Sequence, residues 1–166
     1  MRTVSLTFRR AMLEQQSGET AAVLLTITHP SLAQPIYLSS DPTTRINETP
    51  VQYATVSRGN TYQFLPFSIT LPDDVSERSP VARIQLDNVD RRLVTLIRSI
   101  TSPPSVNIEV VLISTPNVVE MSWPNFQMKS APYNAGSMTI ELSIDALTDE
   151  PFPGDSFDSS GFPALF

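Results

Sequence analysis

Fifteen prolines interrupt this chain of 166 residues along most of its length, against only five glycines. Average usage would give roughly eight prolines in a chain of this size. Because proline ends helices and is excluded from central strands, the segments between the prolines have to be short and joined by turns. The spacing of the prolines therefore predicts a β-rich fold made of many short strands.

Apolar alternation with a period of two predicts strands between these turns. In the segment SMTIELSID, apolar and polar side chains fall on opposite faces, which is typical of antiparallel sheets with one solvated face. The apolar parity changes at Pro66, where a bulge would reset the buried face, and again at Pro124. Residues 41–50 are polar with turn residues at both ends, which predicts an exposed loop. The predicted strands lie over 21–28, 34–40, 51–57, 60–72, 81–89, 105–114, 118–130 and 137–145.

A helix is predicted near the N-terminus from a different spacing of apolar residues. Val4, Phe8, Ala11 and Met12 fall on one face of a helix with a period of 3.6 residues. Gly18 follows as a C-terminal stop signal. The stripe is narrow, so we expect this short helix to dock on a sheet or on a neighbour.

A second helical stripe predicts a helix near 89–101. Arg91, Arg92 and Arg98 face away from that stripe. A solvated face is the simpler interpretation of these arginines, and a salt-bridged contact with an acidic neighbouring subunit is the functional one. Together the patterns predict one domain over 1–148 that is mainly β, a mostly antiparallel β-sandwich or barrel, with one or two flanking α-helices.

The segment 149–166, DEPFPGDSFDSSGFPALF, holds four of the eight phenylalanines among prolines and glycines. No helix or central strand accepts that composition. Burying one such side chain is worth about 1.5–3 kcal/mol, whereas four exposed ones promote aggregation. We therefore predict an extended C-terminal arm that lies in a groove of its own domain or of the next subunit, and both alternatives stay open. The predicted interface residues of this arm are Phe152, Phe157, Phe162 and Phe166.

Residues that usually carry catalysis or metal binding are scarce. The absence of cysteine excludes disulfides, thiolate nucleophiles and cysteine-based metal sites. The only histidine, His29, precedes Pro30 in a predicted turn, where a surface role is the simpler interpretation. A Ser–His–Asp triad would need this imidazole as its base. We expect a protein without enzymatic activity, cofactor or metal.

The charge pattern bears on possible partners. The net charge is −6, and Lys129 is the only lysine beside ten arginines. Without a basic stripe, a clamp for nucleic acid is not expected, and an acidic surface would let DNA pass without binding. No stretch approaches the roughly 20 apolar residues of a membrane span, so we expect no membrane insertion by this chain.

Three strings give the sequence a resemblance to a known family: YQFLPFSITLPDD, ARIQLDNVDRRLVTLIRSI and DEPFPGDSFDSSGFPALF. They resemble small phage and prophage proteins encoded in the tail modules of siphophage-like genomes. The resemblance implies a minor virion protein at the distal end of the tail, near the tip or baseplate hub, present in the bacterial cytoplasm during assembly. Its implied partners are further copies of the chain in a ring, and the proteins of the tail tube and tip.

Three hypotheses of function follow. The first is a structural distal-tail or tail-tip adaptor that forms a ring and links tube to tip, with 41–50 and 149–166 as contact segments. The second is a module that binds a host glycan or receptor, for which Trp123 and Tyr133 are the candidate aromatic platforms, although Trp123 fits a core position better. The third is a tail-associated hydrolase, which the missing cysteine and the single histidine disfavour.

Overall fold

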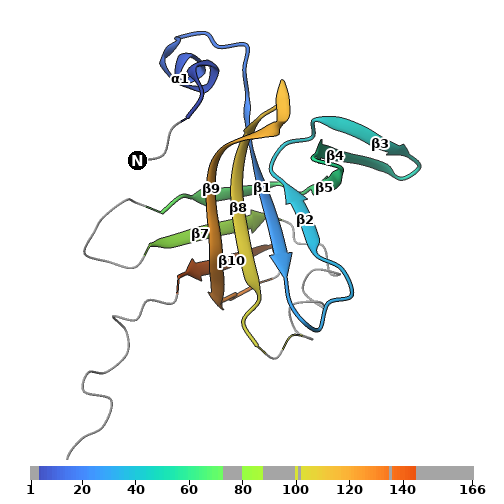
Figure 1. Cartoon of the computed structure of the whole chain (residues 1–166). Helices are drawn as coiled ribbons and strands as arrows, with labels where there is room; N and C mark the ends of the chain where they lie inside the picture. Colours follow the sequence, from blue (N-terminus) through green and yellow to red (C-terminus); the bar gives the residue numbers. More distant parts are fainter. Residues whose placement is uncertain (1–3, 73–79, 88–99, 101, 135, 145–166) are drawn as a thin grey trace, which may run out of the picture.

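The protein is described by a computed structural model that covers residues 4–72, 80–87, 100, 102–134 and 136–144 (Figure 1). This part of the chain contains one helix and ten β-strands. The helix expected near 89–101 lies outside the described residues. The elements are α1 (Leu6–Leu13), β1 (Ala21–Thr28), β2 (Ile36–Ser39), β3 (Thr44–Glu48), β4 (Val51–Ser57), β5 (Asn60–Phe64), β6 (Phe67–Thr70), β7 (Val81–Asp87), β8 (Ser105–Leu112), β9 (Thr115–Ser130) and β10 (Ser137–Ser143).

The described strands belong to one hydrogen-bonded sheet in the order β3-β4-β5-β2-β1-β8-β9-β10-β7-β6. Neighbouring strands run antiparallel except β2 and β5, which are parallel. The mainly β, mostly antiparallel fold is confirmed. It is a single open sheet with β3 at one edge and β6 at the other.

The sheet bends so that its two parts face each other. Figure 1 shows β7 and β10 crossing β1 and β8 steeply. The 16-residue strand β9 belongs to both parts, because it pairs with β8 along its length and with β10 near Gln127. A bulge at Pro124 and Asn125, where Asn125 has a φ of 61°, redirects the strand between them. Trp123 before the bulge and Phe126 after it are both buried, which confirms the parity change predicted at Pro124.

The main hydrophobic core lies between these two parts of the sheet. Its side chains come from β1, β8 and β9 on one side and from β7 and β10 on the other, and each strand contributes every second residue over most of its length. α1 adds one residue, Phe8. The fully buried members include Ile84, Leu86, Val106, Ile108, Leu112, Phe126, Met138 and Leu142.

A smaller apolar cluster covers the opposite face of β1 and β8. It consists of Ala22, Leu24 and Val111 beneath Tyr62 of β5. The ring of Tyr62 also packs edge-on against Tyr37, with centroids 5.0 Å apart. Through Val111, β8 therefore also buries part of its second face, and a tyrosine from β5 covers it.

The prediction of one bulged strand over 60–72 is wrong. β5 ends at Phe64 and pairs with β4 and β2, whereas β6 begins at Phe67 and pairs with β7 at the far edge of the sheet. Between them the Leu65 N–H donates to the Ser39 carbonyl at 3.0 Å, and Pro66 has no N–H to continue the ladder. The parity change at Pro66 marks a move of the chain to another part of the sheet.

The N-terminal cap of α1 fastens the helix to β9. The Ser5 hydroxyl accepts a hydrogen bond from the Phe8 N–H at 3.1 Å, as N-cap residues do. The Ser5 N–H and hydroxyl in turn donate to the two carboxylate oxygens of Glu120, at 2.8 and 2.7 Å. Glu120 is buried, so these bonds match a carboxylate that would otherwise lack partners.

The extent of this helix differs from the prediction. It ends with Glu14 as its C-cap, four residues before Gly18. Phe8 is buried and Val4 packs on the core as predicted, but Met12 is 71% exposed. With eight residues the helix contacts the sheet mainly through its first turn, so its second turn, which carries Met12 and Leu13, lies against solvent.

Candidate functional site

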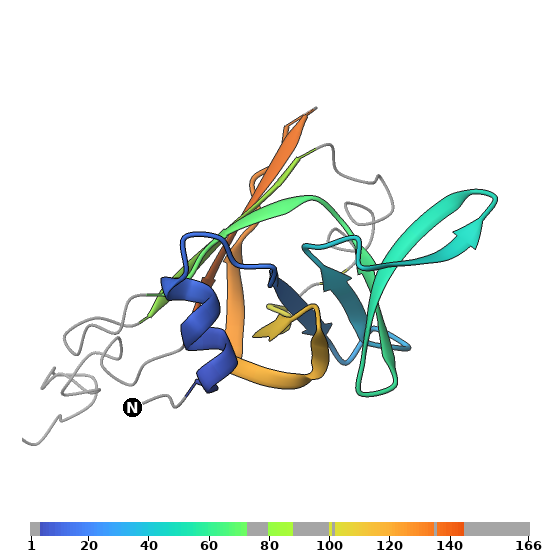
Figure 2. The same cartoon turned by 90° about the horizontal axis from the view of Figure 1, so that it is seen from above.

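The β-hairpin β3–β4 projects from the body of the molecule (Figures 1 and 2). Every residue of β3 is exposed, and so are the first three residues of β4. The expectation that 41–50 is exposed is confirmed, but the expected loop is wrong because residues 44–48 form a strand. Neither face of this strand is buried, so its sequence carries no apolar alternation from which a strand could be predicted.

Exposed apolar side chains gather on this hairpin. Val51 and Tyr53 are 54% and 41% exposed, and they share one face of the hairpin because they are two residues apart in β4. Ile46, at a bulge in β3, and Val56 on the other face of β4 are also exposed. Four exposed apolar side chains on one projecting hairpin form a surface suited to protein contact. We call β3–β4 with these four side chains the hairpin arm.

Buried hydroxyl groups fix the base of the hairpin arm. The Thr55 hydroxyl, which is fully buried, lies 2.8 Å from the hydroxyls of both Ser39 and Thr43. The Asp41 carbonyl accepts hydrogen bonds from the hydroxyls of Thr55 and Ser39, both at 3.2 Å. The network ties β4 to β2 and to the connection before β3, so it sets the direction in which the arm leaves the body. This network could not be predicted from the sequence, because serine and threonine residues in a polar stretch form no pattern that identifies which of them are buried.

A second brace holds the turn that follows β4. Arg58 and Gly59 have φ of 49° and 80°, the left-handed pair that a tight type I′ hairpin requires. The Arg58 N–H donates to the Asn117 side chain at 2.6 Å, and the Ser57 hydroxyl donates to the Pro116 carbonyl at 2.6 Å. These bonds connect the β4–β5 turn to the beginning of β9.

An ion pair strengthens this brace. The Arg58 guanidinium forms a two-pronged contact with the Glu109 carboxylate of β8. The hydrogen bonds to Glu109 raise the pKa of Arg58, against a smaller opposing effect of burial. The hairpin arm is therefore held at its base by hydroxyls, and the β4–β5 turn behind that base is held by a charged pair.

The other predicted interface residues lie outside the part of the chain that the structure describes. They are Arg91, Arg92 and Arg98, and the residues of the predicted C-terminal arm, Phe152, Phe157, Phe162 and Phe166. Of the two aromatic platforms considered for glycan binding, Trp123 is buried in the core and Tyr133 is 46% exposed. The structure therefore does not combine them into one exposed aromatic surface.

His29 is buried and braces a turn. Its Nδ1 accepts a hydrogen bond from the Ser31 N–H at 3.0 Å. A neutral imidazole that accepts at Nδ1 carries its hydrogen on Nε2, so Nε2 donates to the Ser102 hydroxyl 2.6 Å away. The ring is thus arranged as a donor toward this serine, the reverse of the base in a catalytic triad. The sequence placed His29 in the right turn but at the surface, which is wrong.

Within residues 4–72, 80–87, 100, 102–134 and 136–144, no group of three or more His, Asp or Glu side chains is placed to hold a metal ion. No helix in these same ranges is long and apolar enough to cross a membrane.

The hairpin arm and both parts of the sheet lie inside a region that matches a known family. Among curated proteins, nothing matches the chain. The family model for a domain of unknown function, DUF1833, matches residues 7–156, which is most of the sequence. The chain belongs to the DUF1833 family.

Proposed function

We propose that this chain is a structural virion protein of a bacteriophage tail: a distal-tail or tail-tip adaptor whose copies form a ring that links the tail tube to the tip. The observation that carries the proposal is the hairpin arm, which presents Ile46, Val51, Tyr53 and Val56 to solvent from a braced base. The resemblance of three sequence strings to proteins of phage tail modules supplies the setting.

A braced arm is suited to assembly because little conformational freedom is lost when it docks. Ordering a mobile loop at an interface costs free energy for each immobilised residue. The hydroxyl network and the Arg58–Glu109 pair have already ordered this hairpin in the single chain. Burial of its apolar side chains in a neighbour then contributes to affinity at about 25 cal/mol per Å².

The open sheet also supplies the two different surfaces that a ring needs. A ring closes through heterologous contacts, in which one patch meets a different patch of the next copy. β3 and β6 stand at opposite ends of the described strand order, so the two sheet edges are chemically distinct. The partners are further copies of this chain and the adjoining tube and tip proteins, and the net charge of −6 suits a lumen through which DNA passes.

The double variant Val51→Asp with Tyr53→Asp tests this function by sedimentation velocity and by electron microscopy of tail particles. We expect the unchanged chain to form closed rings and to be incorporated in tails, and the variant to stay monomeric because charges replace its apolar contact. Leu13→Asp is the matched control, since Leu13 is 86% exposed on α1 and outside the arm. A chain that stays monomeric at all concentrations and is absent from particles contradicts the proposal, as does equal assembly of both variants.

A further inference from the structure

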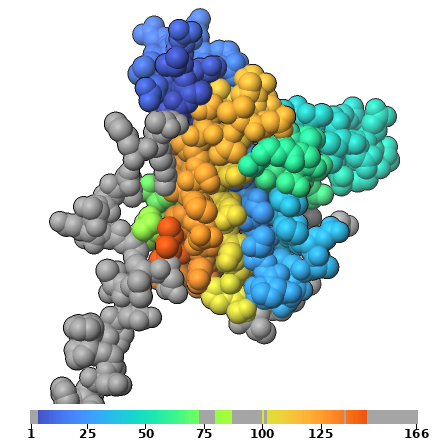
Figure 3. Space-filling view, viewed as in Figure 1, coloured from blue at the N-terminus to red at the C-terminus, as the bar shows by residue number. Residues whose placement is uncertain are grey.

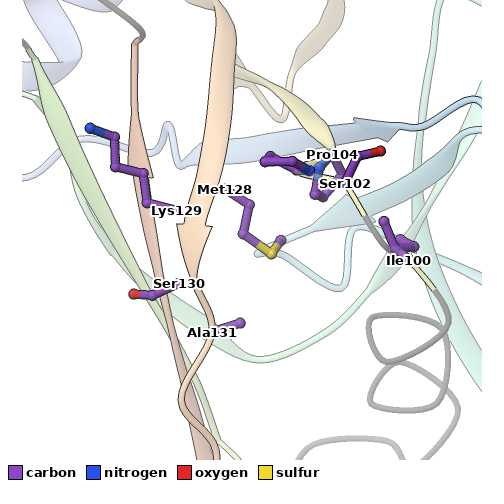
Figure 4. A pocket seen from close by; sticks show the side chains of 8 residues that line it. Ile100, Ser102, Pro104, Met128, Lys129, Ser130 and Ala131 are labelled. Atoms are coloured by element: carbon purple, nitrogen blue, oxygen red, sulfur yellow. The ribbon is translucent and has the colours of Figure 1, made fainter. Parts of the chain in front are cut away.

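A small apolar cleft opens at one end of β8 and β9 (Figure 4). Its volume is about 250 Å³, and its apolar lining consists of Ile100, Pro103, Pro104, Met128 and Ala131. Pro104 and Met128 are buried and form the floor, where the Met128 N–H donates to the Pro104 carbonyl at 3.2 Å. In the space-filling view of Figure 3, this end of β9 is seen below the helix, where the orange and yellow strands end.

The lining favours an aromatic occupant. Figure 4 shows Met128 directed toward the side of Ile100 and Ser102, while Lys129 and Ser130 extend from the opposite side of β9. A methionine thioether adapts its shape and makes favourable contacts with aromatic ring edges. A cavity of roughly 150 Å³ is enough to take up benzene. The cleft therefore has room for one phenyl ring.

The topology places the end of β10 near this cleft. β10 pairs with the same part of β9, with Leu142 opposite Met128 and Ser143 opposite Gln127. Paired residues on neighbouring antiparallel strands are about 4.5–5.5 Å apart. The last described residue, Ile144, is therefore two residues beyond the partner of Met128, in the direction away from Ser130 and Ala131, so a segment that continues from there has to turn back to reach the cleft.

The sequence that follows carries a suitable side chain at a suitable distance. Phe152 comes after seven residues, 145–151, whose extended length is up to roughly 24 Å. Pro153 restricts Phe152 to extended conformations, which lowers the entropy that docking would cost.

We propose that the cleft holds Phe152 of the same chain. A tether of seven residues keeps this phenylalanine at an effective concentration in the millimolar range, which a neighbouring copy or another protein would have to exceed. The root of the C-terminal segment is thereby fixed to β9, and Phe157, Phe162 and Phe166 extend beyond it for other contacts. This inference holds for the isolated chain and does not depend on ring formation or on a phage tail.

Disulfide trapping tests the proposal, because the chain has no cysteine of its own. Pro103→Cys lies on an exposed wall of the cleft, and Gly154→Cys lies two residues after Phe152. We expect this pair to form an intramolecular disulfide in dilute solution about tenfold faster than the control pair Pro103→Cys with Gly161→Cys. A dimer linked between two chains, equal rates for both pairs, or no disulfide at all would overturn the proposal.

A second measurement uses the uncrosslinked protein. With ¹³C-labelled methionine methyl groups, the ring current of a phenyl group seated in the cleft shifts the Met128 methyl resonance, and Met128→Leu assigns that resonance. Phe152→Ala is expected to remove the shift, and Phe166→Ala is expected to leave it unchanged. Neither variant touches the described core, so loss of folding does not obscure the result. A Met128 resonance that is insensitive to Phe152→Ala, or equally sensitive to both variants, counts against the assignment.

Discussion

The bent sheet and the hairpin arm consist of the same kind of strand but are stabilised by different interactions. In the bent sheet, β8 buries Val106, Ile108 and Val110 at alternate positions, so apolar area removed from water holds it. In the hairpin arm, β3 buries no side chain, and hydroxyl hydrogen bonds around Thr55 hold the base. The comparison shows that one sheet can keep a stable body and a rigid projection, with apolar side chains left at the projection for a partner.

The largest expected effect is on the bent sheet. Phe126→Ala removes a fully buried ring next to the bulge of β9, and such truncations cost about 3–5 kcal/mol. Tyr53→Ala in the hairpin arm removes a ring that is 41% exposed and is expected to change the free energy of unfolding by less than about 1 kcal/mol. Urea unfolding of both variants measures the difference, and similar losses would show that the arm carries part of the core.

The same contrast explains what the sequence could predict. Apolar alternation arises where one face of a strand is buried, so the strand over 21–28 was predicted with the observed bounds. At β3 both faces are solvated, so the segment shows no apolar alternation and a loop was predicted there. At Pro66 the local pattern recorded a change of buried face, but pairing with β7 depends on residues far away in the chain. Periodicity therefore reports burial, and the order of strands in the sheet has to come from the structure.

The candidate site was predicted only in part. The segment 41–50 was a candidate contact because it was predicted to be an exposed loop, and it contains the whole of β3. The apolar residues Val51 and Tyr53 were assigned to an ordinary strand, since nothing local distinguishes an exposed valine from a buried one. The brace between Arg58 and Glu109 joins residues 51 positions apart, which no spacing rule connects.

The next largest effect is expected at the base of the hairpin arm. Thr55→Val keeps the shape of the side chain but deletes the hydroxyl that contacts Ser39, Thr43 and the Asp41 carbonyl. Leaving buried polar partners unsatisfied costs about 1–3 kcal/mol. Thr61→Val, at an exposed position of β5, is the control and is expected to change the free energy of unfolding by less than about 0.5 kcal/mol.

Hydrogen exchange sharpens this second prediction. If the hydroxyl network directs the arm, Thr55→Val should speed amide exchange in β3 and β4 more than in β8, because the loss is local. Uniform acceleration over the whole sheet would mean that Thr55 supports global stability and that the arm has no separate base.

A smaller effect is expected where α1 meets β9. Ser5→Ala removes the helix cap and one of two donors to the buried Glu120 carboxylate, while the residue 5 N–H still donates to it. Losing an N-cap typically costs about 1 kcal/mol. Ser5→Asp is an informative second variant: it can still cap the helix but sets a like charge beside Glu120, so it should not restore stability. Full recovery with Asp, measured by thermal unfolding, would contradict the role given to Glu120.

The smallest effect is expected at the ion pair between Arg58 of the β4–β5 turn and Glu109. Arg58→Lys keeps the charge but loses the two-pronged contact with Glu109, and the Arg58 side chain is 39% exposed, so solvent screening limits the loss to about 0.5 kcal/mol or less. Because the pKa of Arg58 is raised in the folded protein, its contribution to stability is fully present below the ordinary arginine pKa and is lost as the pH rises through the raised pKa. The loss should therefore be the same at neutral and mildly alkaline pH and should shrink in concentrated salt. If urea unfolding showed that Arg58→Lys lowers the free energy of unfolding by several kcal/mol, this pair would be a main support of the hairpin arm. The contrast between the hydroxyl network at the base and the ion pair at the β4–β5 turn would then be wrong.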